Sequence, residues 1–275
     1  MIRSYCAIIL SFGLLVTCKN DAAAPDEKTA FLLENKVRVF IFAGQSNMEG
    51  QAGLSELAVA LRPVPANSMT FYYALDELDL DPAALDVFYH ATKYTHGPEA
   101  GFGHSITNLL AGEEIIIIKY SKGSTTLAVD WNADSGSLYT NLVTLVNNVL
   151  GGTDYQLCGL MWLQGESDAY NMNQAAAYYA NLTNFITSLR TDLHVSSLPF
   201  FIGATDLPGT NTAWEAEVSN AQTAAAANDP DVVTFSTAAV NSNRISGDAI
   251  HYNSQGLVKL GQLFADNFIT WLNRQ

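Results

Sequence analysis

A chain of 275 residues, of which 48% are apolar and 15% charged, is long enough to bury a sizeable core as one globular domain. The formal net charge of −14 gives an acidic surface that repels nucleic acid and other anionic polymers, so a neutral substrate fits better than a polyanion. Neither quantity specifies a fold, which has to come from the pattern along the chain.

The first 18 residues are predicted to be an export signal rather than part of the domain. Arg3 precedes an apolar stretch from Ala7 to Val16, which is too short to cross a bilayer of ~30 Å as a helix. The residues "LVTC" that end at Cys18 resemble a bacterial lipobox, in which the cysteine becomes the lipidated first residue of the mature chain. We therefore expect an exported lipoprotein of the outer membrane or cell surface that touches a membrane only through this lipid. The alternative is a periplasmic or freely secreted protein.

Residues 19–35 are predicted to be a flexible tether, because "KNDAAAPDEK" is polar and rich in alanine. The domain would then span residues 36–275, with no internal repeat and no interior linker. Cys6 leaves with the signal, so Cys158 is the cysteine that remains in the domain beyond the tether, and no disulfide can form there. Inside the apolar run "LCGLMWL" it is expected to be a core residue rather than a nucleophile.

Short apolar runs alternate with longer helical patterns after the tether. Strands are predicted at 36–44, 69–75, 114–121, 156–164 and 199–206, with 232–237 as either a sixth strand or an extended segment. Helices are predicted at 103–110, 138–150, 173–189, 213–227 and 254–271. Several strands are almost continuously hydrophobic, as expected of parallel strands covered on both faces. The order predicts an α/β fold, a three-layer α/β/α sandwich around a central, mostly parallel five-stranded sheet.

In such a sheet the ligand crevice lies beyond the carboxyl ends of the strands, where strand order reverses. Residues that directly follow a strand face this site, whereas residues that follow a helix face the opposite rim. Ser46 in "GQSNM" follows the first strand and is a candidate nucleophile, with simple capping of the next helix as the alternative. The motif is not a Gly-x-Ser-x-Gly elbow, because Met48 occupies the position of the last glycine.

A serine nucleophile needs a base, and the chain offers five histidines. His194 follows a helix, which places it on the wrong rim, and His104 is expected in the first turn of a helix. His90 and His96 lie in the loop after the second strand, and topology does not exclude them. His251 is the best placed of the five.

The polar loop "SGDAIHYNSQG" carries His251, with Asp248 three residues earlier. A turn of that length lets the carboxylate reach one ring nitrogen, which leaves the other nitrogen to face the nucleophile in a fixed tautomer. Asn253 or Ser254 would then cap the C-terminal helix.

Negative charge that develops on an attacked carbonyl needs preorganised donors. The backbone amide of Ser46 is one candidate. Gly123 in "SKGSTTL" follows the third strand, where a glycine lets the backbone approach a ligand closely. Gln164 in "WLQGESDAY" follows the fourth strand and could supply a side-chain N–H. Glu166 and Asp168 would also face the site, so a glycosidase-like carboxylate pair is a rival use of this loop.

Five stretches, taken in order, resemble the SGNH-type carbohydrate esterases. These are "GQSNM", "GPEAGFG" (97–103), "KGSTTL" followed by Trp131, "WLQGESD" and "GDAIH". The greatest similarity is to the sialate O-acetylesterase-like group that includes the acetylxylan esterases of carbohydrate esterase family six. The resemblance spans about residues 38 to 265 and implies an SGNH hydrolase, or flavodoxin-like, form of the fold. The combination of "GQSNM" with "QGESD" is the specific part of the match.

The resemblance implies a Ser-His-Asp acyl-enzyme mechanism, with Ser46 as nucleophile, His251 as general base and Asp248 as its orienting acid. The oxyanion hole would use the amides of Ser46 and Gly123 and the side chain of Gln164.

One position departs from the family pattern. Ser124 stands where the family often has a second glycine, so the residues leave open which amide of this loop donates. The resemblance also implies substrate-binding or site-shaping roles for four further residues, namely Gln45, Asn47, Glu99 and Glu166.

The implied function is a carbohydrate O-acetylesterase that acts on an acetylated glycan, either acetylxylan or a sialic-acid-like sugar. No metal or other cofactor is expected, since the sequence offers no clustered His and Cys ligands. The rival from another class is a non-catalytic glycan-binding lipoprotein that keeps the fold. A peptidase or lipase with the same triad is less favoured, because the chain shows no long apolar lid.

Overall fold

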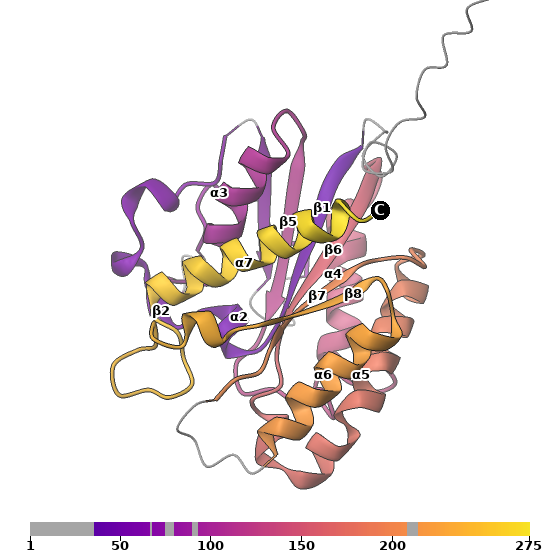
Figure 1. Cartoon of the computed structure of the whole chain (residues 1–275). Coiled ribbons are helices and arrows are strands. Elements are labelled where there is room, and N and C mark those ends of the chain that lie inside the picture. The colour runs from indigo at the N-terminus through magenta and orange to yellow at the C-terminus, as the bar shows by residue number, and fades with distance from the viewer. Residues whose placement is uncertain (1–35, 67, 75–79, 90–92, 208–213) are drawn as a thin grey trace, which may run out of the picture.

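Figure 1 shows the computed structural model of the chain, in which helices cover both faces of a central sheet. The structure describes residues 36–66, 68–74, 80–89, 93–207 and 214–275. The predicted export signal, Cys18 and the tether at 19–35 lie outside the described residues. Within the described ranges the predicted α/β/α sandwich is confirmed.

Six parallel strands form the main sheet in the order β3-β5-β1-β6-β7-β8. Their bounds are Val37–Gly44 (β1), Met69–Ala74 (β3), Ile115–Ser121 (β5), Tyr155–Leu163 (β6), Phe200–Ala204 (β7) and Val232–Ser236 (β8). The strand order reverses at β1, which pairs with β5 on one side and β6 on the other. A ligand crevice is therefore expected at the carboxyl end of β1.

The sheet has six strands where five were predicted, because the segment at 232–237 is a strand rather than an extended loop. β8 lies at the edge of the sheet and pairs only with β7. The polar residues Thr234 and Ser236, which interrupt the apolar run, are partly or fully exposed there. An edge strand tolerates polar side chains, and this is why its sequence is less apolar than that of the inner strands.

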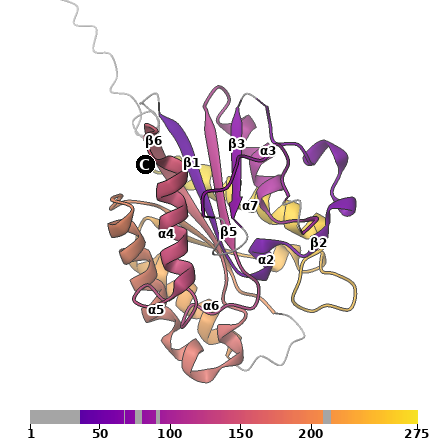
Figure 2. The same cartoon turned by 180° about the vertical axis from the view of Figure 1, so that it is seen from behind.

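The longer helices occupy the predicted places, with small shifts at their ends. Their bounds are Glu99–Leu109 (α3), Ser137–Leu150 (α4), Met172–Asp192 (α5), Glu215–Asn228 (α6) and Ser254–Leu272 (α7). Helices α4, α5 and α6 cover one face of the sheet, and α3 and α7 cover the other (Figures 1 and 2). Asn253 caps α7, since its side chain accepts a hydrogen bond from the amide of Gly256.

Shorter elements connect these layers around the carboxyl end of β1. The one-turn helix α2 is Ser46–Glu49, and the two-residue strands Ala52–Gly53 (β2) and Thr95–His96 (β4) pair antiparallel. Four 3-10 turns complete the described elements, at Leu54–Glu56 (η1), Val59–Leu61 (η2), Asp168–Tyr170 (η3) and Ala238–Val240 (η4). None of the helices in the described part of the chain is long and apolar enough to cross a membrane.

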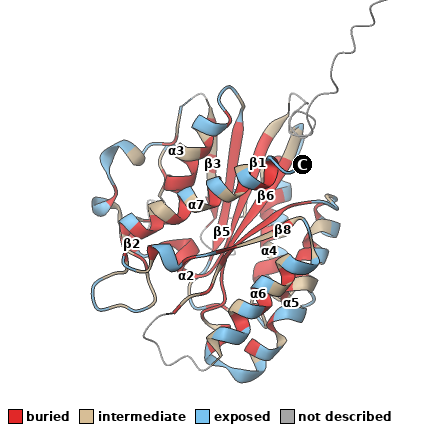
Figure 3. Ribbon diagram, in the orientation of Figure 1, coloured by how far each residue is buried: buried red, intermediate tan, exposed pale blue. Residues whose placement is uncertain are grey.

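The core consists of two apolar layers, one on each side of the buried sheet (Figure 3). Successive side chains of β1 alternate between them, as the two-residue period of a strand requires. Val39 and Ile41 join the cluster under α4, α5 and α6, whereas Phe40 joins the cluster under α3 and α7. Phe40 makes edge-to-face contacts with Phe102 and Phe268, each with ring centroids 5.0 Å apart.

Cys158 lies in β6 and is fully buried, as the sequence predicts. Burial raises the pKa of its thiol to about 12, so the nucleophilic thiolate form is suppressed at neutral pH. Cys158 is therefore a core residue.

Helices α3 and α7 cross so closely that two glycines are required at the contact. A Cβ at Gly261 would lie 2.0 Å from the carbonyl oxygen of Pro98 and 2.4 Å from the amide nitrogen of Phe102. A Cβ at Gly101 would lie 2.1 Å from the carbonyl oxygen of Val258. This contact sets the position of α7, and with it the loop that precedes α7.

We expect Gly261→Ala to lower the free energy of unfolding by about 1–3 kcal/mol, because the methyl group has no room. The loss should occur although alanine favours a helix interior by about 1 kcal/mol over glycine. Urea unfolding measures the difference. Gly53→Ala is the control, since the nearest atoms to its added carbon lie 3.5 and 3.6 Å away. Equal unfolding midpoints for Gly261→Ala and the wild type would contradict the close crossing.

Candidate active site

The loops predicted to form the site follow three neighbouring strands, β5, β1 and β6. Ser46 is the first residue of α2, directly beyond the end of β1. The loop at 246–253 precedes α7 and reaches the same edge of the sheet, where the ring of His251 and the backbone amide of Tyr252 hydrogen-bond to Ser46 and Asn47 of α2. The site thus combines segments that are far apart in the sequence.

Ser46, His251 and Asp248 form one chain of hydrogen bonds. The Oγ of Ser46 lies 3.0 Å from Nε2 of His251, and Nδ1 of His251 lies 2.7 Å from Oδ2 of Asp248. An ionised carboxylate only accepts, so Nδ1 carries the ring proton and Nε2 has a free lone pair for the serine hydroxyl. This arrangement can take a proton from Ser46 during nucleophilic attack.

Asp248 is held by the backbone of its own loop. Its Oδ1 accepts hydrogen bonds from the amides of Ile250, at 2.7 Å, and of His251, at 3.0 Å. Burial tends to raise the pKa of Asp248, but hydrogen bonds from the amide and ring of His251 and from Ile250 outweigh it and lower this pKa. The carboxylate therefore stays ionised wherever His251 needs an acceptor.

Asn47 joins the nucleophile to the loop of the base. Its Nδ2 donates to the carbonyl oxygen of Ile250 at 3.1 Å, and its Oδ1 accepts from the amide of Tyr252 at 3.2 Å. These two residues flank His251 on both sides. The Asn47 Nδ2 also donates to Oε1 of Glu166 at 2.8 Å. Through these bonds Asn47 links α2 to the backbone on both sides of His251.

Arg244 supports the same loop from the other side. Its guanidinium donates to the carbonyl oxygen of Ile250 and stacks over the ring of Tyr252, 4.4 Å from the ring centroid. Sequence reasoning missed Arg244, because a single arginine in a polar loop carries no spacing signal.

Gln45, between β1 and α2, hydrogen-bonds to the loop after β6. Its Oε1 accepts hydrogen bonds from Nε2 of Gln164 at 3.1 Å, from the amide of Gly165 at 3.3 Å and from the amide of Ser167 at 3.2 Å. The side chain is buried, so Gln45 ties the end of β1 to the loop after β6 and does not face a substrate.

The structure contradicts the predicted oxyanion role of Gln164. The residue is completely buried, and its Nε2 is already surrounded by acceptors. These are Oδ2 of Asp168 at 2.7 Å, the carbonyl oxygen of Thr125 at 3.0 Å and Oε1 of Gln45 at 3.1 Å. Because an amide nitrogen has only two N–H groups, none remains for a substrate.

Asp168 also points away from the site that it was predicted to face. It has no exposed surface and accepts the amides of Leu127, at 2.9 Å, and Ala128, at 3.2 Å. Burial raises its pKa above the ordinary aspartate value. Asp168 therefore holds the loop after β5, and the rival glycosidase-like pair with Glu166 loses one of its members.

Glu166 is buried beside the base loop. Its Oε1 accepts from Asn47, while its Oε2 has no hydrogen-bond partner among the described residues. Burial raises the pKa of Glu166, and the hydrogen bond from Asn47 opposes this shift only in part. Glu166 is thus a buried hydrogen-bond acceptor, and burial disfavours its charged form.

Gly123 lies beside Ser46, as predicted, but its amide is already engaged. The N–H donates to Oε2 of Glu49 at 2.7 Å, and Oε1 of Glu49 forms an ion pair with Lys93. Sequence reasoning missed Glu49, although its place three residues after Ser46 in "SNME" puts both on one face of a helical turn. The amide of Ser46 donates to no acceptor in the described part of the chain.

Glu99 shapes the site through a buried ion pair rather than by direct contact. Its Oε2 lies 2.7 Å from Nζ of Lys119, and both side chains are completely buried. Lys119 also donates to the carbonyl oxygen of Glu49 at 3.0 Å and so holds the end of α2. Burial lowers the pKa of Lys119, and Glu99 opposes this shift. A lysine within the apolar run "IIIIKYS" was the available signal for such a partner.

The other described histidines make no hydrogen bond to Ser46. His96 is buried, and its Nε2 lies 2.8 Å from Oγ of Ser254. His104 lies in the middle of α3, beyond the first turn in which it was predicted, and contacts the carbonyl oxygen of Pro63. His194 follows α5 on the opposite rim, and His90 lies outside the described residues.

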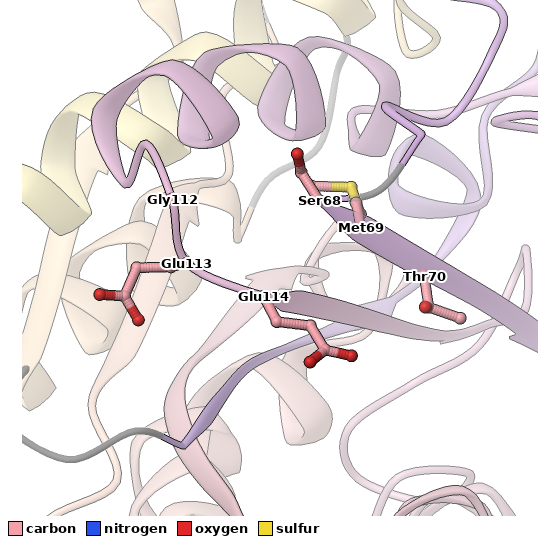
Figure 4. Close-up of a pocket in the computed structure, with 6 residues that line it drawn as sticks. All are labelled: Ser68, Met69, Thr70, Gly112, Glu113 and Glu114. Atoms are coloured by element: carbon pink, nitrogen blue, oxygen red, sulfur yellow. The ribbon is translucent and has the colours of Figure 1, made fainter.

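A hollow of about 470 Å³ lies at the other end of the sheet, where β3 and β5 begin (Figure 4). Its lining consists of Ser68, Met69, Thr70, Gly112, Glu113 and Glu114. Its lining includes no histidine of the kind that a serine nucleophile needs as a base. Among the described residues, no group of three or more His, Cys, Asp or Glu side chains could hold a metal ion.

Known proteins resemble this chain in sequence and in fold. Residues 36–270 match the family described as carbohydrate esterase, sialic acid-specific acetylesterase. A probable carbohydrate esterase of Arabidopsis thaliana is 28% identical over 177 residues, which cover 59% of this chain and 66% of that protein.

Three solved structures share the fold. An Arabidopsis thaliana protein aligns with a TM-score of 0.70 at 22% identity, over 86% of this chain and 98% of that one. NanS aligns with a TM-score of 0.64 at 15% identity, over 88% and 99% of the two chains. A carbohydrate acetylesterase from Xanthomonas citri aligns with a TM-score of 0.59 at 15% identity, over 82% and 54%. At these identities the structural matches show the fold alone.

Because its pKa is raised, Glu166 should make the free energy of unfolding depend on pH. Between the ordinary glutamate pKa of about 4.3 and the raised value, the folded protein binds a proton that the unfolded chain releases, so stability falls as pH rises. We expect Glu166→Gln to abolish this contribution. The free energy of unfolding of the variant should therefore gain on the wild type as the pH rises above about 4, as measured by urea unfolding. Asp168, whose pKa is also raised, is present in both proteins, so its contribution to the pH dependence cancels in the difference. A difference that is constant with pH would contradict the prediction.

Proposed function

Because the chain belongs to the carbohydrate esterase family of sialic acid-specific acetylesterases, we propose that it removes acetyl groups from a glycan by a Ser-His-Asp acyl-enzyme mechanism. The observation that carries this proposal is the hydrogen-bond chain from Ser46 through His251 to Asp248. Its geometry is that of a nucleophile, a base and an acid that fixes the tautomer of the base.

In the first half of the reaction, Oγ of Ser46 attacks the acetyl carbonyl carbon while its proton passes to Nε2 of His251. The C–O bond to the sugar then breaks, and the departing sugar oxygen takes that proton. Ser46 is left as its acetyl ester. Asp248 stabilises the imidazolium ring while it carries both protons.

In the second half, His251 takes a proton from a water molecule that attacks the acetyl-serine carbonyl. The bond to Oγ breaks, Ser46 recovers its proton from His251, and acetate leaves. Asn47 matters in both halves, because it fixes the backbone on each side of His251. The base therefore keeps its distance to Ser46 without reorganising.

The amide of Ser46 is a donor available for the oxyanion of both tetrahedral intermediates. It lies in the first turn of α2, where backbone N–H groups lack helical acceptors. Gly123 is the second candidate donor, although its amide is held by Glu49 in this structure.

The substrate class follows from the family and from charge. The family description supports an acetylated sugar, and a net charge of −14 favours a glycan that is not strongly anionic. Acetylxylan and a sialic-acid-like sugar are the two classes we propose. Acetate release across a panel of acetylated glycans, with a neutral xylan and a sialylated glycan at equal acetyl concentration, distinguishes them.

We expect Ser46→Ala to lower the turnover number by roughly 10⁴–10⁶ while the protein stays folded, because the nucleophile is lost. A chromogenic acetate ester measures turnover, and circular dichroism checks folding. Ser254→Ala is the matched control, since it removes a serine that contacts a different histidine, the buried His96, and should keep most of the activity. A folded Ser46→Ala variant that loses less than about tenfold would exclude Ser46 as the nucleophile.

A further inference from the structure

The carboxylate of Glu49 accepts a hydrogen bond from the amide of Gly123, which is the second candidate donor to the oxyanion in the proposed reaction. Oε2 of Glu49 lies 2.7 Å from the nitrogen of Gly123, and Oε1 pairs with the ammonium of Lys93. The Glu49 side chain is 5% exposed, whereas that of Lys93 is 44% exposed. The carboxylate of Glu49 is therefore buried, while its ion-pair partner Lys93 reaches the surface.

Glu49 and the nucleophile flank the same glycine. A Cβ built on Gly123 would lie 2.9 Å from Oε2 of Glu49 and 3.4 Å from Cβ of Ser46. Ser46 and Glu49 are the first and last residues of α2, so a spacing of three places them on one face of the turn. The carboxylate is thus held at the edge of the space in which an acetyl group must react.

One N–H cannot serve both the carboxylate and the oxyanion. An oxyanion donor must lie about 2.7–3.1 Å from the developing negative oxygen, in line with its N–H. Oε2 of Glu49 fills that place at Gly123. Two negative oxygens at the end of one N–H would also repel each other, so the carboxylate must leave before Gly123 can stabilise the transition state.

We propose that Glu49 is an internal competitor for the oxyanion site, which covers the Gly123 amide until an ester carbonyl displaces it. This inference rests on the proposed esterase function. The ammonium of Lys93 holds the released carboxylate, because it already pairs with the other oxygen of Glu49 and compensates its charge. Glu49 thereby sets how much of the donor set is available to a substrate.

The role opposite to a competitor is that of a positioning residue. Glu49 would be a positioning residue if its hydrogen bond orients the loop after β5 and stays in place during catalysis. Removal of a positioning residue lowers activity, whereas removal of a competitor raises it. The sign of the change therefore separates the two roles.

The experiment compares kcat/KM for p-nitrophenyl acetate in the wild type, Glu49→Ala and Glu49→Gln. One oxyanion donor is worth roughly 10²–10³ in turnover, so freeing Gly123 in Glu49→Ala should raise kcat/KM by roughly tenfold. Glu49→Gln keeps an acceptor oxygen near Gly123 without the charge and should give a smaller rise. Glu56→Ala is the control, because Glu56 accepts from Gly53 and has no contact with Gly123.

A folded Glu49→Ala variant with an unchanged or lower kcat/KM overturns the competitor role. If Ser46→Ala abolishes activity in the same assay, the proposed function survives that result. If neither the wild type nor Glu49→Ala hydrolyses any acetate ester, both proposals fail.

The second readout is the structure of the protein after Ser46 has reacted with diethyl p-nitrophenyl phosphate, whose phosphoryl oxygen mimics the oxyanion. We expect the Gly123 N–H to donate to that oxygen and the Glu49 carboxylate to have moved to Lys93 alone. A carboxylate that still accepts from Gly123 in this adduct overturns the inference.

Discussion

The two hydrogen bonds between the Asn47 side chain and the backbone on either side of His251 are the constraint on which the site depends. They connect residues 203 and 205 positions apart, next to the Ser46–His251 contact, which spans 205 positions. Each such bond contributes only about 1 kcal/mol to stability, but together they orient the base relative to the nucleophile. The close crossing of α3 and α7 supports them, because α7 carries the base loop to this edge of the sheet.

Most of the polar residues in the recognisable motifs serve this framework rather than the substrate. Gln45, Gln164 and Asp168 bond to one another or to backbone amides beneath the reacting groups, and Lys119 and Glu99 hold the end of α2. Buried polar groups are stable only when their hydrogen bonds are satisfied, so such a network admits few alternative arrangements. This network therefore holds the proposed nucleophile and base in fixed positions. The carboxylate of Glu49 is the charged group that competes with a substrate oxyanion for the Gly123 amide.

The sequence predicts much of this arrangement, since apolar runs and helical spacing identify the layers and the strand-end rule places Ser46 on the correct edge. It also proposes Asp248 as the partner of His251, because a turn of three residues lets the carboxylate reach a ring nitrogen. The rule gives the edge but not the direction of a side chain. Gln164 turns inward where the chain bends at Gly165, which has a φ of 142° and whose Cβ would lie 2.4 Å from Oγ1 of Thr205. Neither that bend nor the contact between Glu49 and Gly123 follows from spacing.

The proposed mechanism requires that Ser46 becomes acetylated during turnover. Rapid quenching with a chromogenic acetate ester, followed by peptide mapping by mass spectrometry, tests it directly. We expect one acetyl group on the peptide that contains Ser46, formed and lost at rates that match turnover, and none on that peptide in Ser46→Ala. Steady acetate release while Ser46 stays unmodified, or acetylation at another residue that keeps pace with turnover, would contradict it.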